Sequence, residues 1–210
     1  RGKDSSGIIY FEDTNYSISR SDYSIMELFQ KVNVKKPKLL LGHSRLITNG
    51  HSDNQPVTKK DIYVLHNGII VNDEDLWHQT QQKRSQVIDS ETIAAFAIDN
   101  RENGESFDQL SDKLLKNFKG IVCCAIVFPK EGKLMLFSNN GSLYVGNKNS
   151  ETFFSSEEHP LKAIECENIK QILNDFLILD IPIPSKEHEI HDYENPRLNL
   201  VPQLTLSNSN

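Results

Sequence analysis

The chain has few cysteines and no arrangement of them that is typical of a zinc site or a disulfide framework. Its 210 residues contain only Cys123, Cys124 and Cys166, and no Cys-x-x-Cys pair. An odd number of cysteines with two of them adjacent does not match a secreted disulfide scaffold. We therefore expect a protein of a reducing compartment, the cytoplasm.

Long apolar runs and a basic surface are also missing. The longest apolar runs, such as residues 121–128, are too short to cross a bilayer, and no signal-peptide pattern opens the chain. The 29 acidic residues exceed the 23 basic ones, and the lysines and arginines do not gather in a stripe. We expect neither a membrane nor a nucleic-acid partner, because phosphate binding needs a basic face.

The composition is that of an ordinary globular protein, with 37% hydrophobic residues and a mean hydropathy of −0.48. Apolar runs predict strands at 6–12, 16–19, 39–41, 62–65, 121–128, 133–137, 143–145, 152–155 and 176–181. Helical spacing predicts helices at 22–32, 73–82, 89–100, 107–118 and 160–165. This order predicts an α+β sandwich of two mainly antiparallel sheets with helices outside.

The chain divides into a domain at residues 1–181 and a polar tail or linker at residues 182–210. Four prolines in the tail predict an extended, weakly ordered segment. His188 and His191 lie three residues apart within it, but a zinc site needs three or four rigidly held ligands. A solvated tail is the preferred interpretation, and a metal-dependent activity of the tail is the weakest alternative.

A series of short polar motifs is the most informative feature of the chain. The motifs are Arg-Gly-Lys-Asp-Ser-Ser-Gly at 1–7, Gly-His-Ser-Arg at 42–45, Gln-Pro at 55–56, His-Asn-Gly-Ile-Ile at 66–70 and Asp-Ser-Glu-Thr at 89–92. Taken alone, the Asn-Gly pair within 66–70 favours a hairpin turn. Each motif alone is a weak signal, whereas their order and spacing together are specific.

This series resembles the glutaminase domain of the class II glutamine amidotransferases, especially the domain that supplies ammonia in glutamine–fructose-6-phosphate aminotransferases. The resemblance covers about residues 1–160. It implies a four-layer αββα fold of the N-terminal-nucleophile hydrolase type, and hydrolysis of the glutamine side-chain amide to glutamate and ammonia. It also implies L-glutamine as substrate, a synthase domain or subunit that accepts the ammonia, and no metal or organic cofactor.

Carried onto this sequence, the site residues of the family are Arg45, Thr48, Asn67, Gly68 and Asp89. Arg45 resembles the guanidinium that binds the α-carboxylate of glutamine, because its planar geometry suits a carboxylate. Asp89 resembles the carboxylate that binds the α-ammonium group, and Thr48 would add a polar contact. Asn67 and Gly68 resemble an oxyanion hole, in which the Asn amide and the Gly backbone N–H point at the amide oxygen.

Several of these residues also have purely structural interpretations. Asp89 stands where a helix N-cap is expected, Thr48 suits the end of a strand, and Arg45 could form a surface ion pair. We interpret His43 and His66 as hydrogen-bonded structural histidines and assign neither to the site.

The nucleophile of the family is an N-terminal cysteine, activated by its own α-amino group. In the family it lies one strand and one helix before the motif found here at 1–7, so these residues do not contain it. Cys123 and Cys124 lie in an apolar run, where thiols behave as small hydrophobes, and Cys166 follows the last motif.

We therefore expect this chain by itself to be inactive. Two explanations remain open. The chain is a fragment, which the missing initial Met and the retained site residues favour, or it is a degenerate relative. In the second case it is a non-catalytic module that binds glutamine or a partner in a vestigial pocket.

Overall fold

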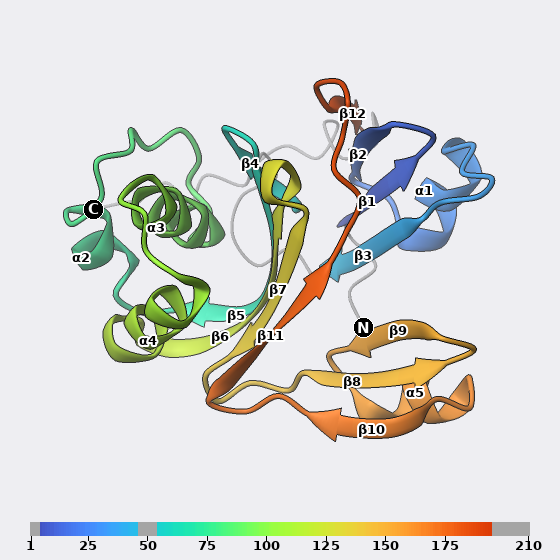
Figure 1. Ribbon diagram of the computed structural model, residues 1–210. Helices are drawn as coiled ribbons and strands as arrows, with labels where there is room; N and C mark the ends of the chain where they lie inside the picture. The colour runs from blue at the N-terminus through green and yellow to red at the C-terminus, as the bar shows by residue number, and fades with distance from the viewer. Residues whose placement is uncertain (1–4, 46–53, 195–210) are drawn as a thin grey trace, which may run out of the picture.

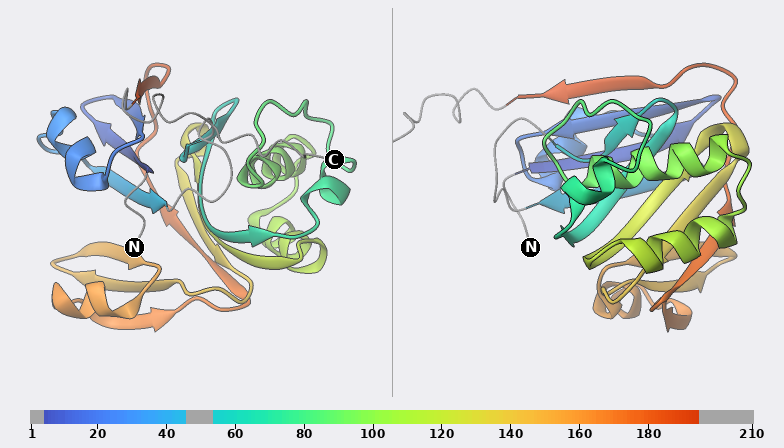
Figure 2. Two further views of the ribbon diagram at one scale, coloured as in Figure 1. Left: turned by 180° about the vertical axis from the view of Figure 1, so that it is seen from behind. Right: turned by 90° about the vertical axis from the view of Figure 1, so that its left-hand side faces the viewer.

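The computed structural model describes residues 5–45 and 54–194, most of which form four stacked layers (Figure 1). Helices α3 and α4 cover one face of a five-stranded sheet, and a four-stranded sheet packs against its other face (Figure 2). Helix α1 covers the outer face of the four-stranded sheet. The αββα sandwich predicted from the sequence is confirmed.

The elements of the layers have the following bounds. The five-stranded sheet contains, in spatial order, β11 (Asp175–Asp180), β7 (Lys133–Ser138), β6 (Gly120–Phe128), β5 (Ile62–Ile70) and β4 (Val57–Lys59). The four-stranded sheet contains β12 (Glu189–Tyr193), β2 (Asn15–Ser21), β1 (Ser5–Glu12) and β3 (Leu39–Arg45). The helices are α1 (Ile25–Lys31), α2 (Asp73–Trp77), α3 (Ser90–Glu102), α4 (Phe107–Asn117) and α5 (Glu158–Ala163), with a 3-10 turn at Pro129–Glu131.

Three hydrophobic clusters fill the three interfaces between the layers. Strand β5 shows how the sequence divides itself between two of them, because successive side chains of a strand point to opposite faces. Val64 packs on the helix side, whereas Tyr63 and Leu65 pack between the two sheets. The third and smallest cluster, around Ile8 and Leu28, lies under α1. Strand β5 therefore contributes side chains both to the core between helices and sheet and to the core between the two sheets.

A third sheet lies beside the sandwich and was not predicted. It contains β10 (Glu167–Gln171), β8 (Tyr144–Lys148) and β9 (Glu151–Ser155), with α5 packed against it (Figure 1). Strand β10 reads Glu-Asn-Ile-Lys-Gln and has a single apolar residue. Without an alternating apolar pattern such a strand gives no sequence signal.

Residues 182–194 are attached to the sandwich and do not form a free tail. Strand β12 pairs in parallel with β2, where two nitrogens of Arg20 bind the carboxylate of Asp192 at 2.6 and 2.9 Å. The Tyr16 hydroxyl donates to the Pro182 carbonyl at 2.7 Å. The expectation of a weakly ordered segment is thus wrong for β12, while the boundary between a domain and a linker at 181 stays a prediction.

Three local predictions need correction. Helix α1 begins at Ile25 and not at the predicted residue 22, because Ser24 and Glu27 form a capping box there. Helix α2 ends at Trp77 and not at the predicted residue 82. The strand predicted at 121–128 begins one residue earlier, at Gly120, which has φ +102 and where a Cβ atom would lie 2.2 Å from the Ile69 carbonyl oxygen.

Strand β3 is less buried than its Leu-Leu-Leu sequence predicts. It is the edge strand of the four-stranded sheet, and Leu40 is 42% exposed while Leu41 is 3% exposed. Within the two described ranges, no helix is long and apolar enough to span a membrane.

Candidate functional site

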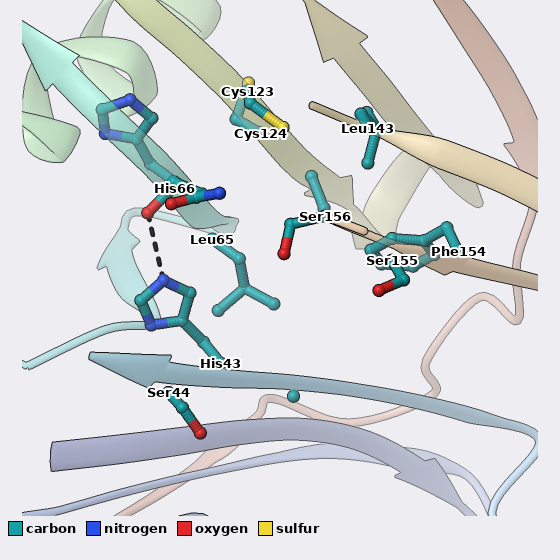
Figure 3. A pocket seen from close by; sticks show the side chains of 13 residues that line it. His43, Ser44, Leu65, His66, Cys123, Cys124, Leu143, Phe154, Ser155 and Ser156 are labelled. Atoms are coloured by element: carbon teal, nitrogen blue, oxygen red, sulfur yellow. Dashed lines mark hydrogen bonds between the residues drawn. The ribbon is translucent and has the colours of Figure 1, made fainter. Parts of the chain in front are cut away.

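A cavity of about 260 Å³ lies between the two large sheets and the third sheet (Figure 3). Its wall is formed by residues 42–44 of β3, 65–67 of β5 and 123–125 of β6, and it is closed by Leu143 and residues 154–156. This volume is slightly below the usual range for small-molecule pockets, about 300–1,000 Å³. The cavity therefore suits a ligand of the size of one amino acid.

The open edge of β5 borders this cavity. Strand β4 pairs with β5 only as far as Val64, so the backbone groups beyond it need other partners. The N–H of His66 donates to the side-chain oxygen of Gln55 at 2.6 Å, and the N–H of Ile70 donates to the Asp89 carboxylate at 2.8 Å. Gly68 lies midway between these residues, and alternation along the strand directs its N–H toward the same edge.

The residue opposite Gly68 supports this direction. Val122 of β6 pairs with Gly68, but its N–H donates to the Asn139 side chain at 2.9 Å and its carbonyl accepts from the Asn139 N–H at 3.0 Å. Both backbone groups of Val122 thus point away from β5, because the two groups of one strand residue point to the same side. The N–H of Gly68, an exposed residue, is thereby directed to the open edge.

Gln55 continues the sheet by means of its side chain. Its amide nitrogen donates to the His66 carbonyl at 2.9 Å while its oxygen accepts from the His66 N–H. The Gln55 backbone itself touches β1, since a Cβ atom on Gly7 would lie only 2.0 Å from the Gln55 carbonyl oxygen. The sequence analysis named this Gln-Pro motif but gave it no role. Gln55 is 6% exposed, and its partner His66 lies 11 residues away, so no local sequence pattern indicates this contact.

The two histidines at this edge are hydrogen-bonded, as predicted. The Nε2 atom of His43 lies 3.1 Å from the His66 carbonyl oxygen, and because a carbonyl only accepts, this nitrogen donates (Figure 3). The His66 imidazole lies on the helix side of β5, with Nδ1 at 3.0 Å from the Ser90 hydroxyl and Nε2 at 3.1 Å from the Ile121 carbonyl.

The family model of the glutamine amidotransferase domain matches residues 43–163, which is more than half of the chain. The chain belongs to this family. Its amidotransferase domain is 28% identical to a glutamine–fructose-6-phosphate aminotransferase (isomerizing) of Chlamydia muridarum over 94% of the chain. It is 24% identical to the enzyme of that name from Rhizobium meliloti over 85% of the chain.

The amidotransferase domain spans about a third of the length of these curated relatives, 34% and 31% respectively. Its fold is similar to that of the glutamine phosphoribosylpyrophosphate amidotransferase of Bacillus subtilis, with a TM-score of 0.70 at 20% identity. That similarity covers 85% of this chain and 41% of the other. The N-terminal-nucleophile hydrolase type of fold, expected from the sequence motifs, is confirmed.

Of the predicted site residues that the structure describes, one lines the cavity and three do not. Asn67 lies in the cavity wall, and Gly68 follows it on the open edge of β5. Arg45 ends β3 directly after Ser44, which is also part of the wall. Thr48 lies outside the described residues. In the ranges 5–45 and 54–194, no cluster of three or more His, Cys, Asp or Glu side chains could hold a metal ion.

Asp89 stands at the N-cap position of α3 but makes no side-chain cap hydrogen bond. Its carboxylate instead accepts from the Ile70 N–H and from the Ser90 hydroxyl at 3.3 Å, and lies 3.8 Å from the His66 ring. Burial by itself would raise the pKa of Asp89, but these neighbours hold it below the ordinary value. The carboxylate is therefore ionised at neutral pH and is directed at β5, so helix capping is not its role.

The cysteines of the amidotransferase domain are unsuited to nucleophilic attack. Cys123 lines the cavity and donates to the Ser142 carbonyl at 3.0 Å, and burial raises its pKa to about 11. Burial, with a smaller contribution from Cys123, also raises the pKa of the neighbouring Cys124. Both thiols are protonated at neutral pH, whereas the thiolate is the nucleophile. Cys166 lies beside the third sheet, in contact distance of Gly146.

His43 should make the amidotransferase domain sensitive to mild acid. Burial, and to a smaller extent the nearby His66, lower the pKa of His43 to about 4. In the unfolded chain this pKa is about 6.5, so between these values only the unfolded state gains the proton. The free energy of unfolding should fall by up to about 3 kcal/mol as the pH decreases from about 6.5 to 4. Above about pH 6.5, His43 should not make the free energy of unfolding depend on pH.

The measurement is urea unfolding of the wild type and of two variants across this pH range. His43→Gln keeps an N–H donor for the His66 carbonyl and should flatten the pH dependence. His159→Gln removes an exposed imidazole and should leave it as in the wild type. An equal pH slope in His43→Gln and the wild type would contradict the assignment.

Proposed function

We propose that this domain binds L-glutamine in the cavity between β3, β5 and the third sheet, and that the site is built to hydrolyse its side-chain amide. The observation that carries the proposal is the open edge of β5, where the Asn67 side chain and the outward Gly68 N–H lie between a cavity and the ionised Asp89. Two donors beside a cavity are what an amide oxygen needs when it gains negative charge.

The roles follow from the chemistry of the two ends of glutamine. Arg45 binds the α-carboxylate, for which a guanidinium offers paired donors, and Asp89 binds the α-ammonium group. Thr48 adds a polar contact to the same end. Asn67 and Gly68 then face the side-chain carbonyl and stabilise the tetrahedral intermediate formed by thiolate attack. Its collapse releases ammonia and leaves a γ-glutamyl thioester, which water cleaves to glutamate.

On this proposal the attacking thiolate is none of the three cysteines of these 210 residues. Neither Cys123 nor Cys124 is ionised at neutral pH, and Cys166 does not line the cavity. The proposal therefore assigns substrate binding and oxyanion stabilisation to this chain, and nucleophilic attack to an N-terminal cysteine of the kind that the family uses.

The fate of the ammonia is part of the proposal. The curated relatives are named aminotransferases, and the chain matches only about a third of their length. We infer that a synthase domain or subunit receives the ammonia, since free ammonia would be lost to solvent. The three free thiols are consistent with a reducing compartment, the cytoplasm.

Calorimetric titration of L-glutamine into the chain tests the pocket. We expect binding that Arg45→Ala weakens at least about thirtyfold, the equivalent of about 2 kcal/mol for a charge-assisted contact. Arg101→Ala is the matched control, because Arg101 pairs with Glu131 away from the cavity and should not affect affinity. Equal affinity of the wild type and Arg45→Ala would remove the carboxylate assignment, and no binding by the wild type would remove the proposal.

The alternative is a non-catalytic module that binds glutamine without cleaving it, which the protonated thiols favour. Ammonia release by the product of the complete reading frame separates the two. The enzyme should release ammonia, and Asn67→Ala should lower the rate about a hundredfold while leaving glutamine affinity nearly unchanged. Binding without ammonia release would support the module.

A further inference from the structure

The His66 side chain lies directly beneath the two donors that the proposed function uses. The imidazole is 1% exposed and contacts Ser90 at the start of α3, so it points to the helix side of β5. The next residue, Asn67, points to the opposite face, because successive side chains of a strand alternate. Its Nε2 atom lies 3.1 Å from the Ile121 carbonyl oxygen. Because that oxygen only accepts, Nε2 carries a hydrogen, and this fixes the orientation of the ring.

Gly68 rests on this ring without a side chain between them. A Cβ atom on Gly68 would lie 2.9 Å from His66 Nε2 and 1.9 Å from the Ile121 oxygen. The ring and the carbonyl thus leave no room for a side chain at Gly68. The position of the Gly68 backbone is set by the position of the ring.

Ser90 links the same ring to Asp89. The Ser90 hydroxyl lies 3.0 Å from His66 Nδ1 and 3.3 Å from one oxygen of Asp89, whose other oxygen accepts from the Ile70 N–H. Ser90 is fully buried, and its oxygen also lies 3.4 Å from the amide nitrogen of Gln55. Hydrogen bonds therefore run from Ile121 through His66 and Ser90 to Asp89 and return to β5 two residues beyond Gly68.

We propose that His66 and Ser90 are positioning residues, which hold the Asn67–Gly68 donors and the Asp89 carboxylate in one fixed geometry. Neither side chain touches the substrate. Asp89 has to face an ammonium group and Gly68 an amide oxygen of the same molecule, so an error in their relative orientation weakens both contacts. This inference rests on the proposed function and extends it to two residues to which the sequence analysis gave no part in the site.

Two single variants and their combination test the network. Ser90→Ala removes the link to Asp89 at a position where alanine favours the helix. His66→Gln keeps an amide nitrogen that reaches about as far as Nε2 and can bind the Ile121 carbonyl, but it loses the contact of Nδ1. Ser111→Ala is the matched control, because it removes another buried hydroxyl, on α4, far along the chain from the site.

Glutamine affinity is the first readout. We expect Ser90→Ala and His66→Gln each to weaken it about tenfold, and the double variant to be no weaker than either single one, because all three break the same connection. Ser111→Ala should bind as the wild type does, although it also loses a buried hydrogen-bonding group. If the network only stabilised the fold, the glutamine affinity of Ser90→Ala would equal that of Ser111→Ala.

Amide hydrogen exchange without ligand is the second readout. The Ile70 N–H should exchange about tenfold faster in Ser90→Ala and His66→Gln than in the wild type, because Asp89 is no longer held against it. Its exchange rate should be unchanged in Ser111→Ala. If affinity and Ile70 exchange both stay at wild-type values while Arg45→Ala weakens binding, the inference is overturned and the proposed function stands. If the wild type does not bind glutamine, the proposed function fails and Ile70 exchange alone decides whether the positioning network exists.

Discussion

Gly68→Ala should lower the free energy of unfolding by about 3 kcal/mol, because two costs add at this position. The residue has φ +151, which an L side chain rarely adopts, and the added Cβ would lie 1.9 Å from the Ile121 carbonyl oxygen. Backbone oxygen cannot rotate away as a side-chain end can, so β5 and β6 have to separate. Urea unfolding measures the change, and glutamine binding should be lost with it.

The matched control for this variant is Gly104→Ala. Gly104 also has a positive φ, +78, but a Cβ atom there would have no neighbour within 4 Å. This substitution should cost only the backbone strain, about 1 kcal/mol. Similar losses in the two variants would mean that the close approach of Ile121 to Gly68 does not matter.

Glu91→Ala should destabilise the protein by about 3–5 kcal/mol, since it leaves a buried charge without its partner. Glu91 is 1% exposed and pairs at 2.7 Å with Lys59, which is 10% exposed. It also accepts from the backbone N–H groups of Ser85 and Gln86. Burial would raise the pKa of Glu91, but the contacts with Lys59, Ser85 and Gln86 keep it below the ordinary value, so the group is charged at neutral pH.

The same helix provides the control for this ion pair. Glu102 pairs with Lys60 at 2.5 Å, but both side chains are about half exposed, 56% and 47%. Glu102→Ala should therefore change the free energy of unfolding by less than about 1 kcal/mol. Urea unfolding of both variants at neutral pH gives the comparison. A loss in Glu91→Ala as small as that in Glu102→Ala would show that the buried pair contributes little.

Much of the sandwich could be predicted because its strands and helices bury apolar side chains at regular spacing. The helix predicted at 89–100 is present as α3, and its Ile93, Phe96 and Ala97 lie in the core between the helices and the five-stranded sheet. Strands β10 and β12 escaped because their residues are mostly polar. They are held at sheet edges by backbone pairing and by an ion pair such as Arg20 with Asp192, which no local pattern shows.

The candidate site was predicted from motifs, and its supporting contacts were not. The Asn67-Gly68 dipeptide alone favours a turn, yet it lies inside β5, because eight consecutive pairs with β6 outweigh the local preference. Asp89 suggested a helix cap, yet its carboxylate binds the Ile70 N–H, a partner 19 residues away. Gln55 and Ser90 contact residues that are distant in the sequence, so these contacts could be seen only in three dimensions.

The missing side chain of Gly7 has a consequence for which substrates would fit. Strand β1 touches the Gln55 backbone at this glycine and pairs through Ser5 with Arg45. Strand β1 therefore connects Arg45, which is proposed to bind the α-carboxylate, with Gln55, which holds the backbone next to Asn67. On the proposed assignment, strand β1 fixes the distance between the two ends of the site. Asparagine is shorter than glutamine by one methylene and would not reach both ends at once.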